Sequence, residues 1–521
     1  MTVSNLRIRP RAAILELTLL GAVSVAVFTF LRSIALDRFI ARDEGFYVMA
    51  AKLVASGQTL YHDFFFTQMP FLVELYSRWL VLTGFSWNNA RLLSVVFTTL
   101  IAMLLYLRAL NLFGTGLALI GVALFTTSHM VFAWFTIVET FALSSLLLFL
   151  AYLVLMETPG WSPRGRMFVV GVLLGLASAT RLFFAGAAPF FALYIIDQEG
   201  KDRRAAATAL LWLSLGFLVA LLPALILAYP SFERFWFNNL GYHLTRYSQG
   251  FLDSMHPKWT ITKTILGIRM GRQFLGPSFA VLCYLSILYA AVTVWRRARM
   301  DLAVVLAIVL FLLNLIPTPS YNQYFCTLSP FLVISALFPL NWVLSGCSKR
   351  FGNAGVCLSY ALVCGILTLC LYDLPSNVRK FTRTGDGVPG VGISKNPKDY
   401  TIRAVQQVSE VLDQHAQPGE RVLTLWPGYL LSSHTTPFPG LENHFGLDVG
   451  DRLDPDQRRF LRVASRAEVI ELVRGGRAPL AAFSEREVRR YLRGALVDGG
   501  YEKVGEVVSM QIYRRTAASN N

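Results

Sequence analysis

Long apolar stretches alternate with short polar connections over the first 374 residues of the chain. With their flanking residues, such stretches are long enough to cross a hydrocarbon core of about 30 Å as helices. The pattern therefore predicts a polytopic α-helical membrane protein with about 11 spans. The clearest of these stretches are residues 14–31, 92–107, 210–227, 281–294, 302–316 and 356–371.

Two polar and aromatic segments interrupt the spans, and we expect them to form outer loops at residues 37–90 and 229–272. In the first loop, apolar residues recur at helical spacing over residues 44–56, which predicts a short helix along the membrane surface that Gly57 ends. A second interfacial helix is expected over residues 71–79. The second loop is expected to be partly helical and partly mobile.

An apolar stretch at residues 167–196 is bounded by basic residues at both ends and is too short for two full spans. Gly175, Arg181 and Gly186 interrupt it. We expect two short helices that form a hairpin, with Arg181 at the tip near the outer face of the membrane.

The character of the sequence changes beyond residue 374. Residues 375–398 are rich in Gly and Pro and are expected to form a linker. Strands and helices then alternate over residues 399–521, which predicts a small soluble α/β domain. We expect helices at residues 401–415, 466–474 and 485–492, strands at 421–426 and 479–483, and a final pair of strands around 503–513.

Composition agrees with a membrane protein, because 54% of the residues are hydrophobic and only 15% are charged. The net charge of +16 does not indicate nucleic-acid binding, because the basic residues are spread over many short loops. They occupy alternate loops, which the positive-inside rule places in the cytoplasm. An odd number of spans then puts the C-terminal domain in the periplasm, outside the inner (plasma) membrane. The basic residues of these loops are Arg164, Arg166, Lys201, Arg203, Arg204, Arg296, Arg297, Arg299, Lys349 and Arg350.

The acidic pair Asp43 and Glu44 follows the first apolar stretch. A charged side chain at the centre of a span costs roughly 2.5–3.5 kcal/mol, so carboxylates beside a bilayer indicate a function. Taken alone, the pair is also typical of an ordinary helix cap. A longer pattern continues behind it, with Tyr47, Ala50, Leu53, Ser56, Gly57, Leu60, Tyr61, Asp63, Gln68 and Pro70.

This pattern resembles the first outer loop of membrane glycosyltransferases of the GT-C fold, such as aminoarabinose transferases and protein O-mannosyltransferases. The order of parts is also similar, with many spans followed by an external α/β domain. The resemblance implies an inverting enzyme that takes a sugar from a polyprenyl phosphate, with Asp43 as the general base. For Glu44 it implies an orienting or acceptor-binding role. Substrate contacts are expected from Tyr47, Tyr61, Asp63, Gln68, Glu139, Arg181 and Tyr324.

The chain departs from the aminoarabinose transferases at Gln68, where that branch has a Lys that contacts the lipid phosphate. Another cation must then bind the lipid phosphate. Arg181 is the preferred candidate, because the family often has Thr-Arg at this point, although an Arg that snorkels to the interface would look the same. Weaker alternatives in the second outer loop are His243, Arg246, Arg269 and Arg272.

Glu139, at the outer start of a span, matches a second acidic position of the family. A carboxylate there is too costly to be incidental, so it is either a substrate contact or the partner of Arg181. Gln323, before Tyr324, replaces a cation that the family often has.

The resemblance implies that an envelope lipid, glycan or protein is the acceptor, and that membrane lipid surrounds the spans. We expect no certain cofactor, with a divalent cation left open. His62, His434 and His444 are more typical of solvated or hydrogen-bonded loop residues than of metal ligands. A transporter or lipid flippase, and a non-catalytic lipid-binding relative, are the alternative functions.

Overall fold

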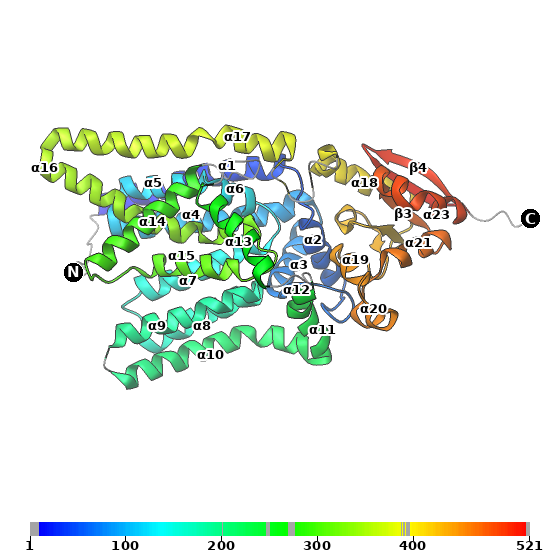
Figure 1. The fold of residues 1–521 in the computed structure, drawn as a ribbon, viewed down its shortest axis with the longest axis horizontal. Helices are drawn as coiled ribbons and strands as arrows, with labels where there is room; N and C mark the ends of the chain where they lie inside the picture. The colour runs from blue at the N-terminus through cyan, green and yellow to red at the C-terminus, as the bar shows by residue number, and fades with distance from the viewer. Residues whose placement is uncertain are drawn as a thin grey trace, which may run out of the picture.

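The computed structural model describes residues 10–200, 202–245, 251–268, 277–386, 388, 391 and 396–516. A bundle of long helices forms one end of the molecule, and a smaller domain with a sheet forms the other (Figure 1). Among the described residues, seven helical segments are long and apolar enough to cross a membrane. They run over Ile14–Asp37, Trp87–Phe113, Thr140–Glu157, Arg203–Thr245, Pro277–Trp295, Asn322–Gly346 and Gly352–Thr384.

The chain is therefore a multi-pass membrane protein, as its hydrophobic pattern predicts. Two shorter apolar helices, α5 (Thr115–Thr126) and α15 (Leu302–Leu315), run among the longer ones. The expected number of about 11 spans stays a prediction. Within the segments above, the helices are α1 (Pro10–Asp37), α4 (Trp87–Phe113), α7 (Thr140–Glu157), α10 (Arg203–Ala228), α14 (Pro277–Trp295) and α16 (Ser329–Tyr372), which Gly352 kinks.

The expected hairpin is present as α8 (Pro163–Thr180) and α9 (Ala188–Glu199), with Arg181 directly after α8. Helix α8 packs very closely on α10, because a Cβ at Gly171 would overlap the carbonyl oxygen of Leu213. Small residues allow such backbone contact between membrane helices. This contact fixes α8, and therefore the place of Arg181 at its end.

The connections with many basic residues lie at the end of the bundle away from the C-terminal domain. Figure 1 shows the α9–α10 turn and the α16 kink at the end of the bundle opposite the C-terminal domain. This arrangement is the one that the positive-inside rule requires if the C-terminal domain is external.

Helices α2 (Glu44–Ala55) and α3 (Phe71–Thr83) lie between the bundle and the C-terminal domain (Figure 1). Both confirm the helices expected in the first outer loop, and Gly57 follows α2 with a positive φ of 90°. Most residues of α2 are buried within the protein, and its expected place along the membrane surface stays a prediction. Helix α2 is covered by α3 and by the short helix η7 (Pro427–Leu430) of the C-terminal domain.

The second outer loop contains α11 (Phe232–Trp236), α12 (Tyr242–Thr245) and α13 (Phe251–Ile265). The range 375–398, expected as a linker, begins as helix, in α17 (Leu374–Arg379) and the π-helical turn η5 (Lys380–Thr384). Prolines at the first turn of a helix are tolerated, so Pro375 does not prevent this.

The C-terminal domain contains a mixed sheet of five strands in the order β2-β1-β3-β5-β4. Strands β1, β2 and β3 are parallel, and β5 is antiparallel to β3 and β4. The expected strands and helices are confirmed, whereas the segment between β1 and β3 holds elements that the pattern did not predict. The strands are β1 (Arg421–Thr424), β2 (Thr436–Pro437), β3 (Leu480–Ser484), β4 (Tyr501–Val507) and β5 (Met510–Arg515), and the helices are α18 (Ile402–His415), α19 (Phe445–Gly450), α20 (Pro455–Leu461), α21 (Arg466–Arg474), α22 (Glu485–Glu487) and α23 (Arg493–Asp498).

Candidate active site

A cavity of about 1450 Å³ opens where the bundle meets α2 and the C-terminal domain. Several segments that are far apart in the sequence line it, including the start of α2, the loop before α3 and the tip of the α8–α9 hairpin. Of the residues singled out from the sequence, Asp43, Tyr47, Gln68, Glu139, Arg181, His243, Gln323 and Tyr324 line this cavity.

Asp43 lies in the turn between α1 and α2, at the N-cap position of α2. Its side chain makes no capping hydrogen bond, so the alternative of an ordinary helix cap does not describe it. The side chain is 31% exposed and lines the cavity. Asp43 therefore presents a carboxylate to the cavity.

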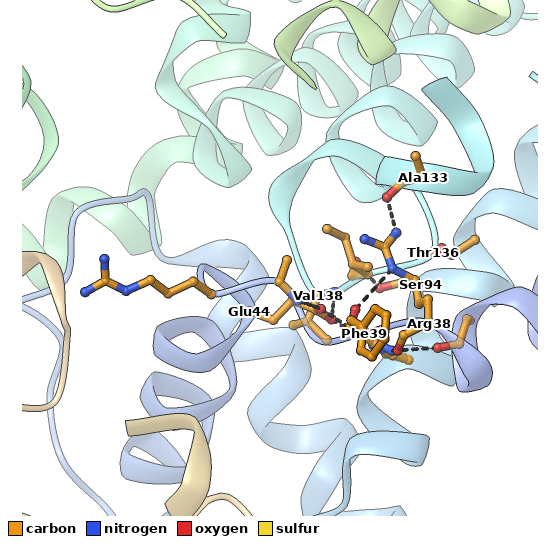
Figure 2. A network of polar contacts seen from close by, with 12 residues as sticks. Arg38, Phe39, Glu44, Ser94, Ala133, Thr136 and Val138 are labelled. Carbon is orange, nitrogen blue, oxygen red and sulfur yellow. Dashed lines mark hydrogen bonds and ion pairs between the residues drawn. The ribbon is translucent and has the colours of Figure 1, made fainter. Parts of the chain in front are cut away.

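Glu44, the next residue, points into the protein and is completely buried. It forms a bidentate ion pair with Arg91 of α4, in which Arg91 Nε donates to Glu44 Oε2 at 2.9 Å. The backbone N–H groups of Ala41 and Val138 donate to the same carboxylate at 2.8 and 3.1 Å. Figure 2 shows Glu44 and Val138 within this polar network.

The Glu44 network joins the end of α1, the start of α2, α4 and the segment before α7. Arg91 also donates to the carbonyl oxygens of Ala35, Arg38 and Phe39 at the end of α1, at distances of 2.7–3.1 Å. Glu44 adjoins Asp43, and Val138 adjoins Glu139. The network therefore fixes the backbone of both cavity carboxylates, which fits the orienting role expected for Glu44 and gives no support to acceptor binding.

The Glu44→Gln substitution is expected to destabilise the protein by about 3–5 kcal/mol, because it leaves the buried guanidinium of Arg91 without its counter-charge. The midpoint of unfolding in detergent measures this effect. Asp197→Asn is the matched control, because Asp197 pairs with Arg299 while 68% of its side chain is exposed. Such an exposed pair contributes less than about 1 kcal/mol. Equal shifts in the two variants would contradict the importance of the Glu44 network.

Glu139 directly precedes α7, and its side chain lines the cavity. Burial, and then the nearby Asp43 and Glu44 carboxylates, raise the pKa of Glu139 well above its ordinary value. A carboxyl group that keeps its proton can donate a hydrogen bond to a substrate oxygen. Glu139 and Arg181 line the same cavity, but no ion pair joins these two described residues, so the geometry fits the substrate-contact role better than the role of partner to Arg181.

Arg181 is held at the cavity wall by aromatic rings. Its guanidinium carbon lies 4.6 Å from the ring centre of Tyr324 and 4.8 Å from that of Phe141. Its Nη1 donates to Thr140 Oγ1 at 3.5 Å. In the described part of the chain, no carboxylate forms an ion pair with Arg181, so its charge is available to an anion in the cavity.

Two residues expected to contact substrate lie away from the cavity wall. Tyr61 is buried and donates its hydroxyl hydrogen to the carbonyl oxygen of Gln68 at 2.7 Å. Asp63 accepts from the backbone N–H of Thr59 at 2.7 Å and pairs with His62. Both side chains hold the shape of the first outer loop, because their partners belong to that loop. Neither side chain is among the cavity-lining residues, so their expected substrate contacts gain no support here and stay predictions.

Among the alternative cations, His243 lines the cavity, whereas Arg246, Arg269 and Arg272 lie outside the described residues. Within the described residues, no group of three or more His, Cys, Asp or Glu side chains is arranged to hold a metal ion. The polar groups at the cavity wall include carboxylates, amides, imidazoles, the ammonium groups of Lys258 and Lys380, and the Arg181 guanidinium.

The C-terminal domain contacts the cavity region directly. Trp426 Nε1 donates to the carbonyl oxygen of Arg42 at 2.7 Å, and its indole covers Gly45, where a Cβ would lie only 2.5 Å away. On the next turns of α2, the Lys52 ammonium donates to the carbonyl oxygens of Leu430, Ser433 and Thr435. These contacts attach the C-terminal domain to the start of α2 and to Lys52 further along the helix.

His444 of this domain is buried 3.6 Å from Asp43, measured between Nε2 and Oδ1. Of the two environments expected for this histidine, solvated or hydrogen-bonded, its burial excludes the solvated one. Arg91 and His444 were both missed as residues of the site. A single charged residue, Arg91, beside a long apolar stretch was a signal for a buried ion pair. No sequence signal connects His444 with Asp43.

No protein-family model matches the chain, and no curated protein matches it by sequence. Solved structures do match it. ArnT from Cupriavidus metallidurans bound to undecaprenyl phosphate is 15% identical, with a TM-score of 0.65 over 96% of this chain and 98% of that one. The same enzyme in the apo state is 17% identical, with a TM-score of 0.64 over 97% and 99%.

A more distant match is the oligosaccharyltransferase of Archaeoglobus fulgidus, which is 11% identical and has a TM-score of 0.53. The match covers 95% of this chain and 75% of that one. These proteins are membrane glycosyltransferases of one fold class, and the match extends over nearly the whole chain. The protein therefore has the GT-C fold, as the pattern of its first outer loop predicted.

Proposed function

We propose that the protein transfers a sugar from a polyprenyl phosphate to a hydroxyl acceptor at the outer face of the inner membrane. The observation that carries this proposal is the presence, in one cavity, of the Asp43 carboxylate and of the Arg181 guanidinium, which has no carboxylate partner among the described residues. The acceptor is an envelope lipid, glycan or protein. The fold shared with ArnT, which was solved with undecaprenyl phosphate bound, supports this reading.

The proposed donor has a long apolar chain, and one part of the cavity suits it. Its wall includes the apolar residues Leu240, Leu244, Phe311, Leu312, Leu315 and Ile316. This wall comes from α15 and the second outer loop, next to the spans. A prenyl chain would enter there from the bilayer, with its phosphate directed to the polar part of the cavity.

The proposed reaction is a displacement at the anomeric carbon. The acceptor oxygen bonds to that carbon while the bond from the carbon to the phosphate oxygen breaks, and the configuration inverts. Asp43 takes the acceptor proton, and the electron pair leaves with the polyprenyl phosphate. Arg181 stabilises this phosphate, as positioned cations stabilise charge that develops in a transition state.

Three other cavity residues fit supporting roles in this reaction. Tyr47, Gln68 and Glu139 can hydrogen-bond sugar hydroxyls, because all three side chains have polar atoms at the cavity wall. Tyr324 supports Arg181 through its ring. Gln68 stands where the aminoarabinose transferases have a Lys. The phosphate site proposed here therefore depends on Arg181 for positive charge more than the site of those enzymes would.

The proposed topology places residues 1–374 in the membrane as the catalytic domain and residues 399–521 outside. The distribution of basic connections supports this orientation. A transporter or flippase, and a non-catalytic lipid-binding relative, would leave the lipid-linked sugar intact, so turnover of the donor separates them from the proposed enzyme.

Vesicles that contain the purified protein and native lipid-linked sugars test the proposal. Mass spectrometry should show that the sugar-bearing lipid is consumed and that free polyprenyl phosphate appears. Movement of intact sugar lipid between leaflets would instead indicate a flippase, and binding without consumption would indicate a non-catalytic relative. Either result would overturn the proposed activity.

A further inference from the structure

His444 is a buried imidazole with no hydrogen-bond partner among the described residues, although both of its nitrogens are shielded from solvent. Buried polar atoms without partners are uncommon and need an explanation. The nearest charged group to its Nε2 is the Asp43 carboxylate, at 3.6 Å, a little beyond hydrogen-bond distance. Asp43 is partly exposed to the cavity, so a small rotation of its side chain closes this gap.

The position of His444 is fixed by its own loop and by aromatic packing. Asn443 Oδ1 accepts from the backbone N–H of Phe445 at 3.0 Å, which shapes the turn into α19. The imidazole packs on Phe445 and Phe46, with ring centres 4.2 and 5.8 Å away. With Trp426 bound to the Arg42 carbonyl, these contacts leave the imidazole little freedom to turn away from Asp43.

We propose that His444 is a positioning residue that donates its Nε2–H to the Asp43 carboxylate, so that the C-terminal domain completes the active site. This inference rests on the proposed function. One carboxylate oxygen of Asp43 is then held by the imidazole, while the other faces the acceptor hydroxyl. The C-terminal domain contributes directly to catalysis instead of serving only as an attached module.

The imidazole is suited to this role because it stays neutral. Burial lowers the pKa of His444 to about 4, against the smaller opposite effect of Asp43. A neutral imidazole carries one N–H, so it donates to the carboxylate without competing for the acceptor proton. The ionisable groups that act on this pair are Arg42 and Asp448 near His444, and Glu139 and Tyr47 near Asp43.

The test compares His444→Phe with His444→Gln in the intact protein in lipid nanodiscs. The Phe variant fills the aromatic pocket but cannot donate, whereas the Gln amide can. We expect the Phe variant to lose about tenfold in kcat and to shift the acid limb of the pH profile of kcat/KM to higher pH by about one unit. The Gln variant should keep most of the activity and the wild-type acid limb.

Equal activity and equal pH profiles in the two variants would overturn the inference, because a purely structural role does not depend on the N–H donor. A loss in the Phe variant without a shift of the acid limb would also overturn it. If the Phe variant does not fold, His444→Met provides the same comparison with a smaller apolar side chain.

The Asp43→Asn background separates this inference from the proposed function. If Asp43→Asn retains activity, the role of the base itself fails, and the inference fails with it. If Asp43→Asn is inactive while His444→Phe matches the wild type, only the inference fails. Where both hold, adding His444→Phe to Asp43→Asn should cause no further loss, because the group that it positions is already neutral.

Discussion

The Asp43→Asn variant is expected to lose 10²–10⁴-fold in kcat, the range typically contributed by a positioned general base. The amide has the same shape as the carboxylate but cannot accept the acceptor proton. Folding should be unaffected, because the Asp43 side chain neither caps α2 nor takes part in the Glu44 network. Transfer of sugar from purified lipid donor to acceptor, followed by mass spectrometry, measures the change.

Asp63→Asn is the matched control for this prediction. Asp63 belongs to the same outer loop, and its carboxylate is bound by Thr59 and His62 away from the cavity. Its variant should transfer sugar within about threefold of the wild type, since surface changes have small effects. Near wild-type turnover in Asp43→Asn would contradict the assignment of Asp43 as the base. A strong loss of turnover in Asp63→Asn would indicate that Asp63 contacts the substrate.

The Arg181→Gln variant is expected to lose about 10²–10³-fold in kcat, the scale seen when one group that stabilises transition-state charge is removed. Glutamine keeps hydrogen-bonding capacity but not the charge that the leaving phosphate needs. Arg181→Lys should recover part of the loss, because it restores the charge without the planar fork that matches a phosphate. Steady-state kinetics with varied donor concentration measures both variants.

Lys258→Gln is the control for Arg181. Lys258 also lines the cavity, but its ammonium donates to the carbonyl oxygen of Ile316 at 3.2 Å on the exposed side. Its variant should change kcat little. If Arg181→Gln and Lys258→Gln behave alike, Arg181 is an interfacial arginine whose charge serves the membrane surface, and the phosphate site must be sought elsewhere.

Local patterns in the sequence predicted most of the elements correctly. The helices α2 and α3 followed from apolar spacing, the α8–α9 hairpin from its basic ends and its glycines, and the strands β1, β3, β4 and β5 from short apolar runs. Such patterns depend on neighbours within one or two turns, so the chain alone specifies them. Segments without periodicity, such as the one that carries His444, were left without prediction.

The candidate site was only partly predictable, because adjacent or nearby residues in the first outer loop have opposite environments. Asp43 faces the cavity, while Glu44 is buried against Arg91. Gln68 lines the cavity, whereas Tyr61 supports the loop behind it. Successive residues of a helix differ by about 100° in direction, so a motif does not tell which of them meets the substrate.

The sequence by itself determined that the protein spans a membrane many times, carries a C-terminal α/β domain and places an acidic pair after its first span. Only the tertiary structure decided which carboxylate reaches the cavity, that Arg181 lies there with no ionic partner in the described part of the chain, and that His444 lies beside Asp43. Hydrophobic periodicity fixes elements through local contacts, whereas these juxtapositions depend on packing between segments up to about 400 residues apart, which no local pattern records.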